Sequence, residues 1–383
     1  MKAVDVMARP ITLASLGNSM LFRRSFFLGW IAAVTLGRLA VADDSAASIA
    51  AGGLVPRRET RIVMAKEVLE IGIEKVEVDY DFLNESDDDV TTEVAFPVPP
   101  YESDFPDGRP LKAQQFKSFR LYVDAKAVPY AIEAKASLKD RDVTALLAAS
   151  HIDIASFGNF DDSKPNSDPK IRDFDRLSAQ EKRKIIAAGL ISIDGGEETP
   201  NWTVHLQYHW TQRFPAHGTV HIRHEYEPVV GYQLMPRAVI ARKLGIADGK
   251  QAKLGEFDRY DAEQLASFCP DDSFLHGILA RFVGNSGDAD YSSLLWVDFI
   301  LTTANTWQRP IRDFTLTVER PKKKDDFSRA ISLCSPGAVK RVDADHFEVH
   351  LQDFVPAKEL RIGFFALPDT SSPENKAPSA RKK

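Results

Sequence analysis

The stretch WTVHLQYHWTQRFPAHGTVHIRHEYEP, residues 202–228, decides the fold because apolar and polar residues alternate on both sides of a proline joint. The apolar set is Val204, Leu206, Tyr208 and Trp210 before Pro215, and Val220, Ile222 and Tyr226 after it, with His224 as the one polar member. A period of two is that of a strand with one buried and one solvated face. We therefore predict an antiparallel hairpin folded about Pro215, in which Tyr208 faces Ile222.

The solvated face of this predicted hairpin carries histidines. Its register places His209 opposite His221, and His205 opposite Glu225. Facing residues on antiparallel strands have Cβ atoms about 5 Å apart, so His209 and His221 could share one zinc or copper ion. His205 lies roughly 13 Å along the strand from His209, so a further ligand would have to come from elsewhere. The alternative is that these are plain surface residues and that the chain holds no cofactor, and the sequence leaves both interpretations open.

The same alternation recurs through most of the chain. Two runs, residues 76–82 and 90–96, flank the polar turn NESDDD, and folding them about that turn places Phe82 opposite Val90. Shorter alternating runs follow at 119–123, 314–318, 347–351 and 360–364. Many short strands with proline-rich joints favour sandwiches over a parallel sheet. The predicted fold class is mainly β, a β-rich α+β protein with antiparallel, sandwich-like sheets and a small helical insertion.

Three segments have helical spacing instead: DRDVTALLAAS (140–150), SAQEKRKIIAAGL (178–190) and DDSFLHGILARFV (271–283). Ser178 is a candidate cap of the second, with Glu181 three residues later and Gly189 near its end. The length predicts two domains: an N-terminal β domain at 43–232 with a helical insertion at about 138–190, and a C-terminal β-rich domain at 233–368. Residues 369–383 have the composition of a disordered tail.

The first 42 residues have the pattern of an export signal. Arg23 and Arg24 precede the apolar run SFFLGWIAAVTLG, and the small residues of AVA end at Ala42. A transmembrane anchor is disfavoured because the run is short and Arg38 follows it, so no membrane span is expected after cleavage. The general secretory route is favoured and the twin-arginine route stays open. We therefore expect a periplasmic or secreted protein.

The net charge indicates which class of partner to exclude, and the two cysteines indicate whether a disulfide is expected. The whole chain has a net charge of −6, and the predicted signal holds five basic residues against one acid, so the mature chain would stand at −10. An acidic chain without a basic stripe is unsuited to nucleic acid. Cys269 and Cys334 are the two cysteines, and export to an oxidising compartment favours a disulfide between them over two buried thiols.

Known catalytic signatures are missing from the sequence. HEYEP has Pro228 where a zinc protease helix would carry its second histidine, and no phosphate loop or dinucleotide fingerprint occurs. Two hypotheses follow. The leading one is a non-enzymatic envelope protein that binds a partner protein or a small ligand. The alternative is a periplasmic, hydrolase-like enzyme whose site, with residues such as His209 and His221, assembles only in three dimensions.

Several separated motifs carry a family resemblance. They are AAGGL, VEVDYDFLNESDDDVTTEVAFPVPP, FPAHGTVHIRHEYEPVVG, SFCPDD and LTTANTWQRPIRDFTLTVERP. In this order they resemble an exported bacterial family, domain of unknown function 4424, over roughly residues 45–366. The resemblance implies a periplasmic or secreted protein of a Gram-negative bacterium. It supplies no catalytic residues.

Overall fold

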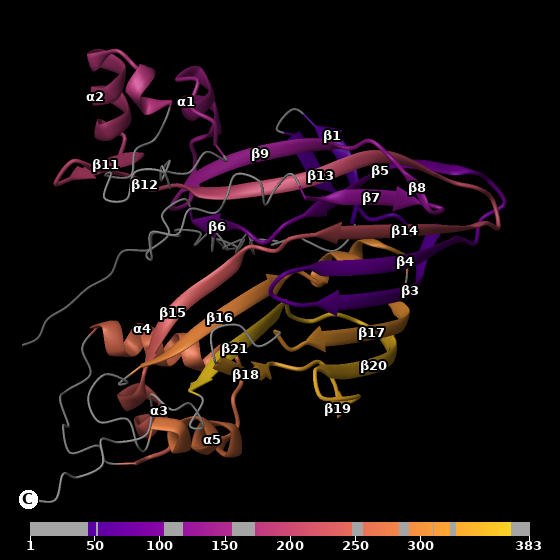
Figure 1. Cartoon of the computed structure of the whole chain (residues 1–383). Helices are drawn as coiled ribbons and strands as arrows, with labels where there is room; N and C mark the ends of the chain where they lie inside the picture. The colour runs from indigo at the N-terminus through magenta and orange to yellow at the C-terminus, as the bar shows by residue number, and fades with distance from the viewer. Residues whose placement is uncertain are drawn as a thin grey trace, which may run out of the picture. The chain divides into compact units, whose positions relative to one another are not determined.

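Strands form most of the structure, as the alternation predicts (Figure 1). The computed structural model describes residues 45–50, 53–102, 118–154, 173–246, 256–282, 291–308, 310–321 and 327–368. The expected export signal at 1–42 and the expected tail at 369–383 lie outside these ranges. The described ranges hold three larger sheets, here called A, B and C, and one small hairpin.

Sheet A has the strand order β10-β9-β13-β5-β1-β2, with β6 paired to β13. Its strands are β1 (Ser45–Ala50), β2 (Gly53–Pro56), β5 (Val90–Pro97), β6 (Tyr101–Glu102), β9 (Ala131–Leu138), β10 (Arg141–Asp142) and β13 (Thr203–Phe214). The small hairpin consists of β11 (Ile191–Asp194) and β12 (Glu197–Pro200). Every pairing within sheet A is antiparallel, so it matches the predicted sheet type.

Sheet B has the order β19-β20-β17-β3-β4-β14-β7-β8. Its strands are β3 (Ile62–Ile71), β4 (Val76–Asn84), β7 (Arg120–Val123), β8 (Lys126–Ala127), β14 (Thr219–Tyr226), β17 (Ile311–Glu319), β19 (Lys340–Arg341) and β20 (His346–Phe354). The pairing of β17 with β3 is parallel and the others are antiparallel. Sheet B therefore joins strands from both predicted domains, 43–232 and 233–368.

The alternating apolar faces of sheets A and B pack against each other. Rings of the two sheets meet in this core: Phe82 of β4 lies 5.9 Å from Phe214 of β13, and Trp210 of β13 lies 5.3 Å from His224 of β14, between ring centroids. All four side chains are at most 4% exposed. The mainly β, sandwich-like fold class is confirmed.

Both predicted hairpins, however, are arches between the sheets. β4 pairs with β14 in sheet B, while β5 pairs with β13 in sheet A. The chain thus crosses from one sheet to the other after β4 and crosses back after β13. Phe82 faces Val220 and not Val90. The predicted registers are wrong, because alternation fixes which side of a strand is buried, and a hairpin and an arch bury the same side.

The two crossings lie side by side and hold each other. Asn84 donates from Nδ2 to the carbonyl oxygen of Phe214 at 3.0 Å. The carboxylate of Asp89 pairs with Arg213 and accepts the Ala216 backbone N–H at 2.9 Å. His217 lies 2.9 Å from Asp87. The acids of NESDDD therefore bind the segment around Pro215, which a local hairpin would not require.

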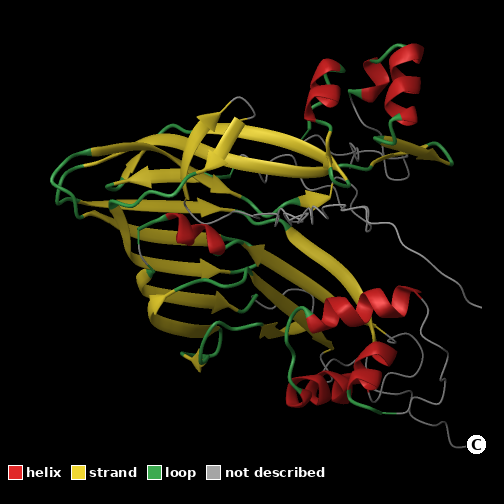
Figure 2. Cartoon of the chain, turned by 180° about the vertical axis from the view of Figure 1, so that it is seen from behind, coloured by secondary structure: helices red, strands yellow, loops and turns green. Residues whose placement is uncertain are grey.

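Sheet C has the order β15-β16-β21-β18, and helices cover one of its faces (Figure 2). Its strands are β15 (Val230–Pro236), β16 (Tyr291–Phe299), β18 (Phe327–Leu333) and β21 (Leu360–Pro368); the helices are α3 (Arg237–Lys243), α4 (Glu256–Ala266) and α5 (Asp272–Phe282). Trp296 lies across β15 at Gly231, where an added Cβ would stand 1.9 Å from its ring. Only glycine leaves room for that indole.

The remaining helices are short, and most fall where the sequence places them. The insertion at 138–190 contains α1 (Thr144–Ala149), η2 (Phe174–Arg176) and α2 (Ala179–Ala187), and η3 (Thr302–Thr306) precedes β17. The predicted capping box is present: Ser178 Oγ accepts the Glu181 N–H at 3.3 Å, and Glu181 accepts the Ser178 N–H at 2.9 Å. α5 matches its prediction, whereas α3 and α4 were not predicted. In the described ranges no helix has the length and apolar character to cross a bilayer.

Candidate functional site

The structure separates the two histidines proposed as metal ligands. His209 lies on β13 in sheet A and His221 on β14 in sheet B, so the prediction that they face each other is wrong. The Nδ1 of His209 lies 2.6 Å from Glu93 on β5, and Thr211 donates to the same carboxylate at 3.0 Å. Over the described ranges, no group of three or more His, Cys, Asp or Glu side chains is arranged to hold a metal ion.

The neighbouring predicted residues also have other partners. His205 faces Lys135 of β9, not Glu225, and its Nε2 lies 2.9 Å from the Ser137 hydroxyl. His224 is fully buried, as expected from its place on the apolar face. Its ladder partners are Val78 and Leu121 instead of Leu206. A buried imidazole among aromatic rings serves the core and is not available to a ligand.

His221 and Glu225, by contrast, do lie in one site. They line an open hollow of about 320 Å³ on the solvated face of sheet B. The lining residues are Asp79 of β4, Tyr122 of β7, Ala125 of the β7–β8 turn, and His221, Arg223 and Glu225 of β14. The three β14 residues share a face because side chains alternate along a strand. Pairing with β4 and β7 then adds Asp79 and Tyr122, which are the ladder neighbours of Arg223.

The β7–β8 turn closes one end of the hollow. Asp124 and Ala125 have φ of +47° and +62°, the backbone of the tight two-residue turn that matches strand twist. Asp124 Oδ1 accepts the N–H of His221 at 3.1 Å, and the N–H of Asp124 donates to the His221 carbonyl at 2.8 Å. These two bonds anchor the turn to β14 and hold Ala125 at the rim.

Two carboxylates hold the ring of His221. Its Nδ1 lies 2.9 Å from Asp81, and its Nε2 lies 3.2 Å from Asp79. The two nitrogens point to opposite sides of the ring, so the carboxylates flank the imidazole and do not converge on a common point. This arrangement fixes the orientation of the imidazole between the two carboxylates.

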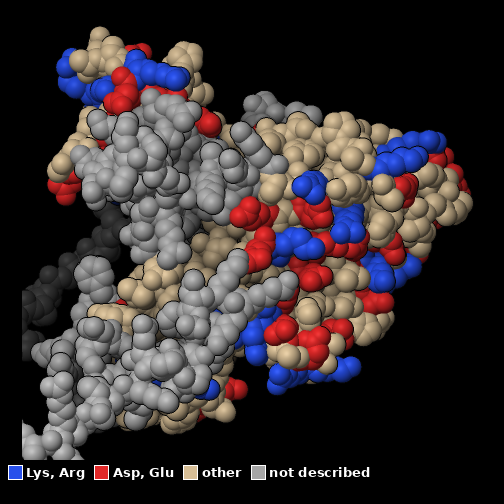
Figure 3. Space-filling view, viewed as in Figure 1, with Lys and Arg blue, Asp and Glu red and all other residues tan. Residues whose placement is uncertain are grey.

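Glu225 lines the hollow as well, and basic and polar side chains surround its carboxylate. It accepts from Arg120 at 2.9 Å and from the Tyr122 hydroxyl at 3.4 Å, and Arg223 lies 3.7 Å away. Arg223 also pairs with Glu77 at 2.7 Å. Figure 3 shows acidic and basic side chains interleaved over this part of the molecule. The hollow therefore presents both signs of charge within a few ångströms.

Charge pairing shifts the ionisation of a group at the edge of this network. Burial raises the pKa of Glu77, but the hydrogen bond from Lys75 and the charge of Arg223 together outweigh it, so the pKa of Glu77 is lowered. The hydrogen bond to Glu77 raises the pKa of Lys75. Both groups are thus held in their charged forms.

Comparison with known proteins gives a family. The sequence profile of a domain of unknown function (DUF4424) matches residues 42–362. The chain belongs to this family. No curated protein matches the chain. A crystal structure from Legionella pneumophila, described as a "putative nutrient binding protein", is similar at 14% identity over 84% of this chain and 70% of that one, with a TM-score of 0.34.

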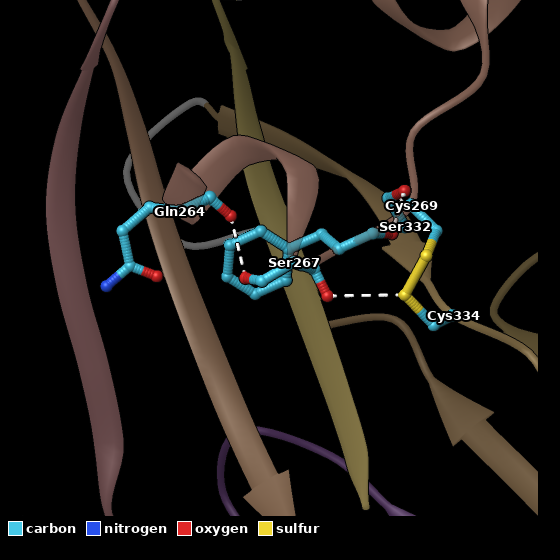
Figure 4. Close-up of a disulfide and its surroundings, with 6 residues drawn as sticks. Gln264, Ser267, Cys269, Ser332 and Cys334 are labelled. Carbon is cyan, nitrogen blue, oxygen red and sulfur yellow. Dashed lines mark hydrogen bonds between the residues drawn. A yellow bond between two sulfur atoms is a disulfide. The ribbon is translucent and has the colours of Figure 1, made fainter. Parts of the chain in front are cut away.

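The two cysteines of this DUF4424 protein form the expected disulfide (Figure 4). Cys269, between α4 and α5, bonds to Cys334, directly after β18. The Sγ of Cys334 lies 3.3 Å from the carbonyl oxygen of Ser267, and the Ser332 hydroxyl donates to the carbonyl of Phe268 at 2.9 Å. The bridge thus ties the helical layer to the edge strand of sheet C.

Sequence reasoning missed Asp79, Tyr122 and Arg223 as site residues. Their local signal was present, since Asp79 lies on the solvated face of the run 76–82 and Arg223 on that of 220–226. Their meeting depends on the pairing of β14 with β4 and β7, which lie about a hundred or more positions earlier in the chain. Only the three-dimensional pairing reveals the hollow in this DUF4424 protein.

Proposed function

We propose that this DUF4424 protein is a binding protein of the cell envelope and that the hollow on sheet B holds a small polar solute. The observation that carries the proposal is the hollow itself, in which charged side chains from adjacent strands surround an open volume of about 320 Å³. Ligand sites of proteins begin at roughly 300 Å³, so this volume suits a small molecule better than a nucleotide or a cofactor.

The scaffold under the hollow supports a binding role. β4 and β14 lie in the middle of sheet B, and their inner faces form the core with sheet A. Sites on paired strands are held more precisely than sites on loops. The inner residues Val78, Tyr80 and Ile222 are fully buried and fix the strands that carry Asp79, His221 and Arg223. A solute would therefore meet a preformed surface.

Export is part of the proposal. The basic pair at Arg23, the apolar run after it and the small residues ending at Ala42 support removal of residues 1–42 during transfer to the periplasm. An oxidising compartment also suits the bond between Cys269 and Cys334. The full chain expressed in a Gram-negative host is expected in the periplasmic fraction with Asp43 as its first residue.

The test uses that exported protein and a panel of free amino acids, sugars, amines and carboxylic acids, each measured by saturation-transfer NMR and calorimetry. At least one class should bind, and Arg223→Ala should weaken its binding about tenfold or more, since a charge-assisted contact is lost. The matched control is Arg176→Ala. It removes an exposed arginine of η2 that pairs with Asp173. Absence of binding, or equal binding by the Arg223→Ala variant, would overturn the proposal.

A further inference from the structure

The polar and charged side chains of the hollow already contact one another. Asp79 pairs with His221 at 3.2 Å, Arg223 with Glu77 at 2.7 Å, and Glu225 with Arg120 at 2.9 Å. Asp79 and Glu225 are both partly exposed, with 29% and 20% of their side-chain surface accessible. A ligand that enters must therefore compete with contacts that already exist.

A ligand of one charge sign would use only one of the two charged groups, Arg223 and Asp79, that line the hollow. An anion that binds Arg223 draws the guanidinium from Glu77, which keeps Lys75 at 2.6 Å, and from Glu225, which keeps Arg120 at 2.9 Å, and it makes no use of Asp79. A cation that binds Asp79 leaves His221 with one carboxylate in place of two. A ligand that carries both signs can meet Arg223 with its anionic group and Asp79 with its cationic group, so it gains two charge-assisted contacts where an ion of one sign gains one.

From this balance we infer that the hollow binds a small zwitterion of the α-amino acid type, an inference that rests on the proposed binding function. Arg223 and Asp79 are direct ladder partners on adjacent strands, and such positions lie about 5 Å apart at Cβ. The ammonium and carboxylate of one amino acid are close enough to meet both side chains. The carboxylate binds Arg223 and the ammonium binds Asp79.

The rest of the lining suits such a ligand. Tyr122 of β7 is a ladder partner of Arg223, and both residues line the hollow. The methyl group of Ala125 lines its rim. The aromatic ring and the methyl group offer apolar surface to an aliphatic ligand side chain. A volume of about 320 Å³ admits an amino acid of small or medium size and leaves little room for a peptide.

The experiment compares three forms of the same molecule. The twenty free L-amino acids are measured one at a time by calorimetry with the mature protein. The tightest binder is then measured again as its N-acetyl form, which keeps only the negative charge, and as its amide, which keeps only the positive charge. Each blocked form should bind at least tenfold more weakly than the free amino acid.

Two variants identify the groups. Arg223→Gln should weaken binding of the free amino acid tenfold or more and leave the weak binding of the amide unchanged. Asp79→Asn should also weaken binding of the free amino acid tenfold or more, and it should leave the weak binding of the N-acetyl form unchanged. Arg176→Gln, on η2, is the matched control and should change neither. Circular dichroism and thermal unfolding verify that each variant is folded.

The outcomes separate this inference from the proposed function. If one blocked form binds as tightly as the free amino acid, the ligand needs one charge only, and the zwitterion is refuted while the binding function stands. If a sugar or a carboxylic acid binds in an Arg223-dependent manner and no amino acid does, the inference fails in the same way. If no compound in either panel binds, the proposed binding function and the zwitterion inference are both refuted.

Discussion

At the scale of single residues, the turn between β19 and β20 shows how hydrogen bonds set ionisation. Asp343 Oδ1 accepts the N–H groups of Asp345 at 2.7 Å and His346 at 2.8 Å, and the His346 ring lies 2.9 Å from the same carboxylate. The Asp345 N–H, then the His346 ring and N–H, lower the pKa of Asp343 to about 2. The hydrogen bond to Asp343 in turn raises the pKa of His346 above 6.5.

The pH dependence of this turn follows from the opposite directions of the two pKa shifts. The lowered pKa of Asp343 stabilises the turn above pH 3.8, and this contribution is lost as pH falls towards 2. The raised pKa of His346 stabilises it below pH 6.5, and this contribution is lost as pH rises through the raised value. We expect Asp343→Asn to lower the pKa of His346 in an NMR titration, because the carboxylate that stabilises the imidazolium is removed. Asp345→Asn removes an equal charge from the same turn and should leave that pKa unchanged; an equal fall in both variants would contradict the assignment.

At the scale of elements, the sequence predicts strands well and their partners poorly. Alternation locates β4, β5, β13 and β14 to within a few residues. Two of the site residues, His221 and Glu225, also follow from alternation. What it cannot give is the arch, because the same side of each strand is buried whether the next strand lies beside it or across the core. One signal was available: Asn84 continues the buried face of β4 as a polar residue, and it is fully buried in the arch.

Asn84 should accordingly be a main determinant of the arches. Its Nδ2 donates to the carbonyl oxygens of Asp88 at 2.8 Å and Phe214 at 3.0 Å, and its Oδ1 accepts the Ser86 N–H at 3.0 Å. Asn84→Ala leaves buried backbone groups without partners, so we expect the free energy of unfolding in urea to fall by about 1–3 kcal/mol.

The control for Asn84 is another asparagine that bonds the backbone. Asn201 is exposed and donates to the carbonyl of Gly189 at 3.1 Å, where water can replace it. Asn201→Ala should cost no more than about 0.5 kcal/mol. If Asn84→Ala lowered the free energy of unfolding by no more than this, the hydrogen bonds of Asn84 between the two crossings would not stabilise the fold.

At the scale of the whole molecule, sheet B connects the chain's beginning to its end. Its order places β17 between β3 and β20, and the parallel register joins Leu316 of β17 to Leu69 of β3. The strands of sheet B come from both predicted domains, 43–232 and 233–368. Length alone favoured two domains, since chains of this size are often divided. A parallel pairing between strands some 250 positions apart leaves no local trace in the sequence, so neither composition nor periodicity could have indicated it.

This connection predicts that the segment 43–232 does not fold alone. Without β17, the edge of β3 loses its ladder, and the core that it shares with Leu316 and Phe314 opens to water. We expect the isolated segment to give a poorly dispersed NMR spectrum and no cooperative thermal transition, whereas the chain 43–383 unfolds in a single step by circular dichroism and by tryptophan fluorescence. A cooperative transition and a well-dispersed spectrum from 43–232 would show instead that β3, β4 and β14 form a stable sheet without the C-terminal strands. The hollow would then be complete within the first 232 residues, and the same fragment could be tested for binding directly.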